Sequence, residues 1–356
     1  MKIVLTGGGT AGHVMPHIAL LDDLKKYFDE IIYIGSKNGI EKKLINEQKQ
    51  QIKYISTTTV KFERGFKLKN LLIPFKLLKG INECKKILTE IKPDVIFSKG
   101  GFVSVPVCIA AKKLNIPVVS HESDFSLGLA NKIIYRYAKV MCCSFKKTCD
   151  YGEKCVFTGS AIRKSLLAGS KEDCIKNLNL NPSLPTILVT GGSLGAKSLN
   201  EKIWEVQKQL LNTFNIIHLC GKDKANLKAN NILGKGKYIQ IEFTAKPENL
   251  YACADIVICR AGSNTIFEFL ALEKPMLLVP LSSSASRGDQ ILNAQYFKQQ
   301  NLADFILEKD LTNEILIDKI NSVFNSQTQI VNNIKKSGFS IGNEKIIRQI
   351  LQNLKK

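Results

Sequence analysis

Apolar and polar residues follow two recurring patterns along this chain. Short, fully apolar runs are typical of strands buried in a parallel sheet, and each is followed by a stretch with helical spacing. The clearest example is the segment Ile256 to Pro280, in which two apolar runs, Ile256–Cys259 and Met276–Val279, flank an amphipathic helix. This arrangement predicts a βαβ unit with a parallel sheet, and hence an α/β fold.

The same pattern recurs on both sides of residue 160. Further strands are predicted at 2–6, 31–34, 52–56, 95–97, 117–120, near 140 and 156, and at 186–190, 216–219 and 238–241. The GGGTAG turn at 7–12 and the GGSLGA turn at 191–196 each follow a strand and open a helix, so the chain repeats one βαβ plan. At 356 residues it is also longer than a usual single domain. We expect domains over 1–160 and 161–340, and a basic C-terminal helix over 341–356 that packs back on the first domain.

The turn after Cys259 is a candidate anion site. It runs from Arg260 to Thr265 and opens a helix, whose free N–H groups and dipole favour negative charge. Glu268, one helical turn further on, is suited to binding the hydroxyls of a ribose or a sugar. The alternative is an ordinary βα turn with Ser263 as N-cap and a solvated Glu268. Arg260 is expected to brace this turn rather than to bind phosphate.

The first glycine turn formally matches the dinucleotide motif GxGxxG at Gly7, Gly9 and Gly12. That motif requires an acidic residue at the end of the second strand, and the sequence there is Gly35-Ser36-Lys37. A dehydrogenase is therefore disfavoured. What remains is a tight turn that presents His13 at the start of a helix. Four further polar residues, His121 to Asp124, are predicted directly after the strand 117–120, where a doubly wound sheet binds its ligand.

Composition narrows the functional classes. No apolar run approaches the ~18 residues of a membrane helix, and the N-terminus enters a strand without a leader. The ten cysteines form no CxxC pair and there are only four histidines, so reduced thiols in a cytosolic protein are expected and a metal site is not. The net charge of +20 reflects either genome composition or attraction to polyanions. No aromatic-interleaved basic module indicates nucleic-acid binding.

The segment 64–79 interleaves apolar residues with lysines. Such a helix can lie on an anionic lipid surface, with Phe66, Leu72 and Phe75 inserted and Lys76 at the headgroups. The alternative is a core helix with a solvated charged face. A different segment, the polar stretch from Leu281 to Asp289, is predicted to be a ligand-closing loop.

Taken together, the ordered motifs closely resemble the MurG family. They are GGGTAGH at 7–13, His121-Glu122, GxxxR at 159–163, GGSxGA at 191–196, and RxGxxTxxE at 260–268 followed by Asp289-Gln290. The resemblance covers roughly residues 2 to 340. It implies a GT-B type fold, with two facing Rossmann-like domains and a cleft between them. It also implies inverting transfer of N-acetylglucosamine from UDP-N-acetylglucosamine to the polyprenyl acceptor lipid I, giving lipid II, at the cytoplasmic face of the cell membrane as a peripheral protein.

The resemblance also implies roles for individual residues. His13 is the expected general base, because an imidazole has an unperturbed pKa near 6.5, and Glu122 is the alternative base. No metal or other cofactor is expected, because helix N-termini and side chains stabilise the departing diphosphate. The residues implied in donor binding are Thr10, Ala11, Gly12, Asp124, Arg163, Ser193, Thr244, Ser263, Asn264, Thr265, Ile266, Phe267, Glu268 and Gln290.

Some positions depart from the family pattern, including Ala11, Asp124, Thr244 and the serine-rich segment before Asp289. They leave two alternatives open. One is another nucleotide-sugar enzyme of the same fold, such as a UDP-N-acetylglucosamine 2-epimerase or a glycolipid glycosyltransferase. The other is a membrane-recruited binding subunit without catalysis.

Overall fold

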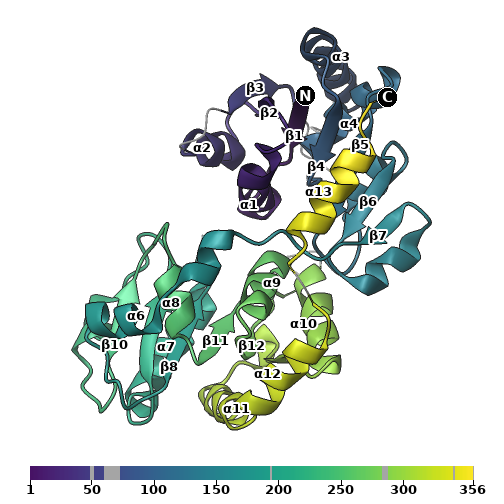
Figure 1. Ribbon diagram of the computed structural model, residues 1–356. Helices are drawn as coiled ribbons and strands as arrows, with labels where there is room; N and C mark the ends of the chain where they lie inside the picture. Colours follow the sequence, from purple (N-terminus) through teal and green to yellow (C-terminus); the bar gives the residue numbers. More distant parts are fainter. Residues whose placement is uncertain (49–51, 60–72, 193–194, 283–287, 340, 356) are drawn as a thin grey trace. The chain divides into compact units, whose positions relative to one another are not determined.

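The computed structural model describes residues 1–48, 52–59, 73–192, 195–282, 288–339 and 341–355. The chain divides into two compact units, which are considered separately (Figure 1). Unit 1 comprises Met1–Ile162 together with Ile341–Lys356, and unit 2 comprises Arg163–Ser340. The predicted Phe66, Leu72 and Ser193 sites, and most of the predicted ligand-closing loop, lie outside the described residues.

The described part of unit 1 contains a parallel sheet of seven strands in the order β3-β2-β1-β4-β5-β6-β7. The strands are β1 (Lys2–Thr6), β2 (Glu30–Ser36), β3 (Lys53–Thr57), β4 (Val95–Ser98), β5 (Val118–Glu122), β6 (Val140–Cys143) and β7 (Cys155–Phe157). The helices are η1 (Ala11–His13), α1 (Met15–Leu24), α2 (Ile40–Asn46), α3 (Ile73–Ile91), α4 (Ser104–Lys113), α5 (Leu129–Tyr135), η3 (Lys146–Tyr151) and α13 (Asn343–Gln352).

Helices cover both faces of this sheet, which explains why its strands read as continuous apolar runs. Alternate strand residues enter two cores: Ile3 and Leu5 pack with residues of α1 and α13, and Val4 packs with residues of α3, α4 and α5. The last helix therefore belongs to unit 1. Its first residue, Asn343, is buried, accepts a hydrogen bond from the Ile162 N–H and donates one to the Ala19 carbonyl.

The described part of unit 2 contains a six-stranded parallel sheet in the order β10-β9-β8-β11-β12-β13. The strands are β8 (Thr186–Thr190), β9 (Asn215–Leu219), β10 (Tyr238–Ile241), β11 (Ile256–Cys259), β12 (Met276–Leu278) and β13 (Asp304–Phe305). The helices are η4 (Lys164–Ala168), α6 (Lys171–Leu178), α7 (Lys197–Leu210), η5 (Leu227–Asn231), α8 (Glu248–Cys253), α9 (Ser263–Ala271), α10 (Asp289–Gln299), η6 (Glu308–Asp310), α11 (Asn313–Asn325) and α12 (Gln327–Lys336).

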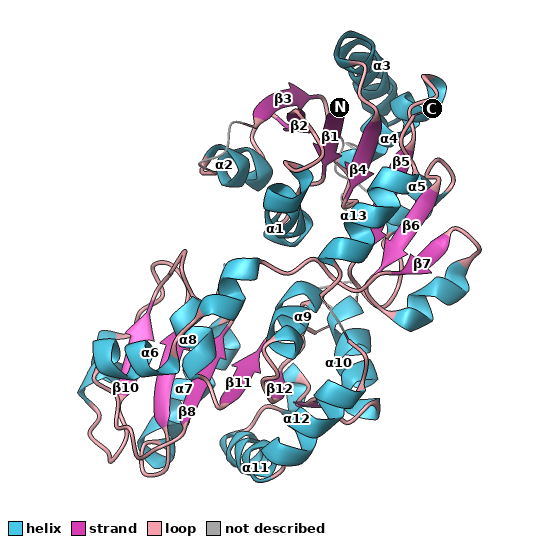
Figure 2. Cartoon of the chain, viewed as in Figure 1, coloured by secondary structure: helices cyan, strands magenta, loops and turns pink. Residues whose placement is uncertain are grey.

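The two sheets share one topology. Both units combine strands with surrounding helices (Figure 2). Counted from the first strand of each unit, the order over the first six strands is 3-2-1-4-5-6, the order of a Rossmann fold. The α/β class and the repeated Rossmann-like plan are thus confirmed. In such a sheet, ligands bind at the carboxyl ends of the strands where the order reverses. That point lies between β1 and β4 in unit 1, and between β8 and β11 in unit 2.

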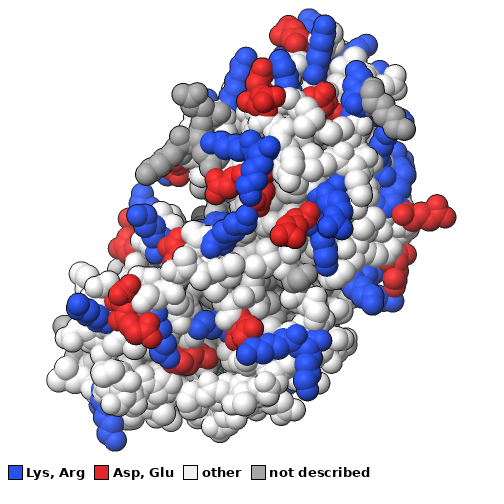
Figure 3. Space-filling model, in the orientation of Figure 1, with Lys and Arg blue, Asp and Glu red and all other residues white. Residues whose placement is uncertain are grey.

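The net charge of the chain is +20. On the face shown in Figure 3, Lys and Arg side chains are intermingled with Asp and Glu. No helix in the described ranges is long and apolar enough to cross a membrane.

Candidate functional sites of the two units

The turn between β1 and α1 forms the first half of the candidate site. It contains Gly9 with a positive φ of 86°, a conformation that glycine adopts without strain, and ends in the 3₁₀ turn η1. Thr10 is exposed, Ala11 and His13 are half-buried, and Gly12 is exposed. His13 Nδ1 lies 3.1 Å from Thr10 Oγ1, so the threonine hydroxyl orients the imidazole ring.

The turn after β4 packs directly against this first turn. Gly100 and Gly101 both have positive φ, 77° and 78°. A Cβ at Gly101 would lie 2.5 Å from the Gly8 carbonyl oxygen and 3.3 Å from His13 Nδ1. Only glycine permits this approach, so the two glycine turns and His13 form one assembly at the point where the strand order reverses.

The apolar pattern predicts that His121 and Glu122 follow a strand. They are instead the last two residues of β5, and both are buried. Both Glu122 carboxylate oxygens are engaged: they accept hydrogen bonds from the Asp124 N–H (3.0 Å), the Gly128 N–H (3.0 Å) and Asn131 Nδ2 (2.9 Å). Burial and the nearby Asp124 charge raise the pKa of the Glu122 carboxyl. Glu122 therefore holds the loop that follows β5, and to act as the alternative general base it would have to give up some of these hydrogen bonds.

Lys99 is a buried cation behind this half-site, and the patterns in the sequence did not predict it. The Lys99 side chain donates to His121 Nδ1 and to Ser123 Oγ, and His121 Nε2 donates to the Gly159 carbonyl at 3.0 Å. This set of partners requires a neutral imidazole protonated on Nε2. Burial lowers the pKa of Lys99 to about 8, although the Glu122 and Asp124 carboxylates act in the opposite direction. The only feature of the sequence that could have indicated this buried lysine is its position after an apolar strand and before two glycines.

In unit 2, the turn after β8 leads into α7 with Ala196 as its N-cap. Gly195 has a positive φ of 66° and lies against the Cys220 carbonyl, where a Cβ would approach its oxygen to 2.3 Å. The turn after β11 leads into α9, whose N-cap is Gly262. Ser263 is the first helical residue, so the alternative with Ser263 as N-cap is wrong.

The segment Ser263 to Glu268 divides between two environments. Asn264, Thr265 and Glu268 are half-buried. Ile266 and Phe267 are buried in the core, where the Phe267 ring packs edge-on against Phe297. The side chains of Ile266 and Phe267 are therefore not available to a ligand, and these two residues can contribute only backbone groups. This corrects the expectation that the whole segment lines the site.

Glu268 is paired with Arg163, the first residue of unit 2. Arg163 Nε and Nη2 lie 3.3 Å and 3.1 Å from Glu268 Oε1. Burial raises the pKa of the Glu268 carboxyl, and the Arg163 guanidinium opposes this shift. Within the described structure the pairing engages only Oε1, so Oε2 of this fixed carboxylate remains available to a ligand. Two residues that are far apart in sequence thus meet at the second turn of α9.

Arg260 braces unit 2, as expected, and is nine-tenths buried. Its Nη1 donates to the Val279 carbonyl at 3.1 Å, and its Nη2 donates to Ser198 Oγ (3.0 Å) and Glu308 Oε1 (2.6 Å). The guanidinium thus ties the end of β12 to α7 and η6.

Thr244 and Gln290 lie at the remaining turns of unit 2. Thr244 is half-buried and its Oγ1 accepts a hydrogen bond from the Lys246 N–H at 3.1 Å, which shapes the segment after β10. Gln290, in the first turn of α10, accepts a hydrogen bond from the Leu281 N–H at 3.0 Å. In unit 1, Asp124 is half-buried in the loop after β5.

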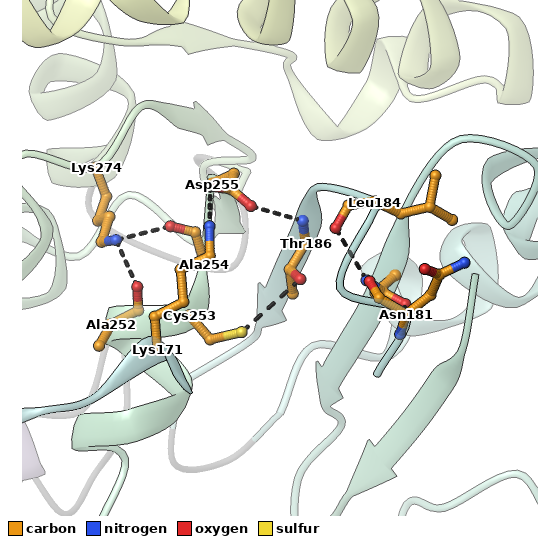
Figure 4. A network of polar contacts seen from close by, with 10 residues as sticks. Lys171, Asn181, Leu184, Thr186, Ala252, Cys253, Ala254, Asp255 and Lys274 are labelled. Atoms are coloured by element: carbon orange, nitrogen blue, oxygen red, sulfur yellow. Dashed lines mark hydrogen bonds and ion pairs between the residues drawn. The ribbon is translucent and has the colours of Figure 1, made fainter. Parts of the chain in front are cut away.

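The opposite edge of the unit 2 sheet is closed by contacts within the protein (Figure 4). Asp255 accepts from the Thr186 N–H and from Lys171 Nζ, at 2.8 Å and 2.7 Å. Lys274 Nζ donates to the Ala252 and Ala254 carbonyls, at 2.8 Å each. Because these polar groups satisfy one another, the groups oriented toward a ligand gather at the carboxyl edge. Among the described side chains, no group of three or more His, Cys, Asp or Glu is arranged to hold a metal ion.

Two family models match the chain. The glycosyltransferase family 28 N-terminal domain matches residues 3–142, and the corresponding C-terminal domain matches residues 186–353. Curated relatives from Clostridium botulinum and Clostridium tetani are 47% and 46% identical, over 99% and 97% of this chain and 98% and 96% of their own lengths. Both are named UDP-N-acetylglucosamine–N-acetylmuramyl-(pentapeptide) pyrophosphoryl-undecaprenol N-acetylglucosamine transferase.

Solved structures are similar over almost the whole chain. MurG of Acinetobacter baumannii is 25% identical, with a TM-score of 0.79 and 99% of both chains covered. A UDP-N-acetylglucosamine 2-epimerase is 12% identical, with a TM-score of 0.65 over 98% of this chain and 94% of that one. At that identity, the second similarity shows the fold alone.

The lowered pKa of Lys99 predicts how stability depends on pH. The unfolded chain keeps the Lys99 proton up to about pH 10.5, whereas the folded protein releases it near pH 8. Between these values the unfolded chain binds more protons, so this group makes the fold more stable as pH rises, by about 3 kcal/mol in total. In Lys99→Met that contribution should be absent when free energies of unfolding are compared with the wild type by urea titration from pH 7 to pH 10.5. Exposed Lys112→Met is the control, and equal pH slopes for Lys99→Met and wild type would contradict the buried charge.

Proposed function

Since the chain belongs to glycosyltransferase family 28, and within it to the MurG family of N-acetylglucosamine transferases, we propose that it transfers N-acetylglucosamine from UDP-N-acetylglucosamine to lipid I. Lipid I is undecaprenyl-pyrophosphoryl-N-acetylmuramyl-pentapeptide, and the products would be lipid II and UDP. The observation that carries the proposal is 47% identity to a relative so named over 99% of this chain, which takes in both glycine turns. The reaction contributes to peptidoglycan synthesis.

The chemistry proposed for unit 1 is general base catalysis by His13. Its imidazole would take the proton of the acceptor hydroxyl as the oxygen attacks the anomeric carbon of N-acetylglucosamine. The bond from that carbon to the diphosphate breaks at the same time, so the configuration inverts and UDP leaves with the bonding electrons. Support comes from the half-buried ring, held by Thr10 Oγ1 at the reversal point of the sheet.

The donor would bind unit 2. The start of α9 offers backbone N–H groups to the diphosphate, and Arg163 lies beside it with its charge. Glu268, held through Oε1 by Arg163, would accept hydrogen bonds from the ribose hydroxyls. Thr244, in the segment after β10, and Gln290, in the first turn of α10, would contact the nucleotide and the sugar. With the helix N-terminus and Arg163 balancing the charge of the departing diphosphate, we propose a reaction without a metal or other cofactor.

We also propose that the protein binds the cytoplasmic face of the cell membrane as a peripheral protein, through α3. Phe75 and Leu78 are 73% and 57% exposed, and Lys76 and Lys79 are exposed beside them. Exposed apolar groups flanked by lysines suit an anionic lipid surface, where the polyprenyl acceptor resides. We attribute the net positive charge of the protein to lipid binding rather than to nucleic-acid binding. On the surface shown in Figure 3, acidic side chains interrupt the basic ones.

The decisive experiment is incubation of the full-length protein with labelled UDP-N-acetylglucosamine and a lipid I analogue. A labelled disaccharide-lipid and an equal amount of UDP are expected. Formation of the N-acetylmannosamine epimer in the absence of lipid would identify a 2-epimerase instead. Donor binding without either product would favour a non-catalytic subunit.

His13→Ala is expected to reduce turnover by ~10²-fold or more, because it removes the base from the transition state. Binding of UDP-N-acetylglucosamine should be nearly unchanged, since most of the expected donor groups lie in unit 2 and the substitution leaves the residues Thr10 to Gly12 in place. Turnover is measured with the lipid I analogue and donor binding by calorimetry. Wild-type turnover in the variant would remove His13 from the mechanism.

Replacement of Phe75 and Leu78 with Ser should weaken binding to vesicles of anionic phospholipid by at least ~10-fold, because two exposed apolar side chains no longer insert. Vesicle sedimentation measures the change, and an unaltered melting temperature excludes unfolding. Leu233→Ser in unit 2 is the control, since Leu233 is 91% exposed and lies outside the proposed surface. Equal losses in both proteins would indicate non-specific adsorption rather than a membrane surface on α3.

A further inference from the structure

A buried carboxylate lies directly beneath the first glycine turn. Glu41, in the first turn of α2, has no exposed surface. Its Oε2 accepts a hydrogen bond from the Gly9 N–H at 3.3 Å, and its Oε1 accepts one from the Ser36 N–H at 3.0 Å and one from the Ser36 hydroxyl. Among the described residues, no Lys, Arg or His forms an ion pair with Glu41. A buried charge of this kind is maintained only by the hydrogen bonds that it accepts.

The surrounding backbone is shaped to admit this carboxylate. A Cβ at Gly8 would lie 2.7 Å from Glu41 Cδ, and a Cβ at Gly39 would lie 2.2 Å from both carboxylate oxygens. Side chains at either position would displace the group. Two of the glycines around Glu41 are therefore required by the acid itself and not by a ligand.

Two tyrosines hold the same assembly from the strands. Tyr33 in β2 donates its hydroxyl to the Gly7 carbonyl at 2.8 Å, and Tyr54 in β3 donates to the Ser36 carbonyl at 2.6 Å. The two rings are stacked, with centroids 5.8 Å apart. The glycine turn is thus held at Gly7 by a phenol and at Gly9 by a carboxylate, on the side away from solvent.

In a dinucleotide-binding fold, the acid near the end of the second strand reaches outward to a ribose. Here the acid comes from the helix after β2 and reaches inward, onto an N–H of the protein's own glycine turn. The turn leads from Gly9 through Thr10 directly into η1, which carries His13. Fixing the Gly9 peptide therefore fixes the start of the segment that presents the imidazole.

We propose that Glu41 is a positioning residue for the transfer reaction, which holds the turn Gly7–His13 so that His13 meets the acceptor hydroxyl. This inference rests on the proposed function, because it assigns the residue that sets the geometry of the proposed base. Without the carboxylate, the N–H groups of Gly9 and Ser36 lose their acceptor and the turn relaxes. A misplacement of about 1 Å can lower a rate by ~10²-fold.

Glu41→Ala and Glu41→Gln test the assignment in the full-length protein with the lipid I analogue. Glu41→Ala should lower kcat by ~10²-fold, with a much smaller change in the donor KM and the calorimetric donor affinity, since most of the expected donor groups lie in unit 2. Glu41→Gln keeps an acceptor oxygen for one of the two N–H groups, so its loss should be smaller. The matched control is Asp94→Asn, because Asp94 accepts the Lys2 N–H (2.7 Å) at the opposite end of β1; its kcat should stay at the wild-type value.

A double variant separates positioning from a general loss of stability. If Glu41 acts through His13, then His13→Ala with Glu41→Ala should be no slower than His13→Ala alone. Multiplied losses in the double variant, or a parallel fall in donor affinity, would overturn the proposal. So would wild-type kcat in a folded Glu41→Ala or Glu41→Gln protein.

Histidine NMR gives a measurement that does not depend on turnover, and the chain has only four histidines. The His13 ring resonances should shift in Glu41→Gln and stay in place in Asp94→Asn. Unmoved His13 resonances in Glu41→Gln would refute the positioning role even if wild-type activity is confirmed. A wild-type protein that makes no disaccharide-lipid, but whose His13 signals respond to Glu41→Gln, would refute the proposed function alone.

Discussion

The parallel direction of every strand pairing is the constraint on which both units depend. In a parallel sheet, the connections that follow the strands all begin at the same edge. Where the strand order reverses, two neighbouring connections run to opposite faces of the sheet, and a crevice opens between them. In unit 1 this brings the turns after β1 and β4 against each other, so closely that Gly101 has room for no side chain beside the Gly8 carbonyl and His13. In unit 2 the same reversal brings together the turns after β8 and β11. The placement of the candidate residues follows from this geometry.

Buried charges give these turns their shape. Glu41, Lys99 and Arg260 are each at least nine-tenths buried, and each forms hydrogen bonds with groups of the protein. Burying a charge is costly, and removing its partners is costlier still, so such groups fix one arrangement of the backbone around them. The groups suited to meet a substrate are the half-exposed ones, His13, Thr244 and Gln290 among them. These three charged residues thus act as supports, and polar side chains of moderate exposure contribute to the site surface.

Local sequence patterns predicted much of the fold. The strands at 186–190 and 238–241 have the predicted bounds, because each is a short run bounded by turn residues. The end of β5 was predicted two residues too early, since His121 and Glu122 are polar and buried together with their partners. Ile266 and Phe267 were assigned to the site with their neighbours, but the helical period turns them into the core. The sequence motif indicated the segment 263–268, and the geometry of helix α9 determines which of its residues face outward.

The sequence by itself determined the α/β class, the repeated Rossmann-like plan and the family, because apolar period, glycine turns and motif order are properties of consecutive residues. It also placed His13 at the turn after the first strand and Glu268 in the helix after β11. Only the tertiary structure decided which charged groups point inward. The Gly9 N–H meets a carboxylate 32 residues away, and His121 meets a carbonyl 38 residues away. No local pattern encodes such a pairing, since it depends on two strands or a helix and a turn being packed together first. The second strand ends without an acid, but the helix that follows it supplies Glu41, whose carboxylate is turned toward the protein's own backbone.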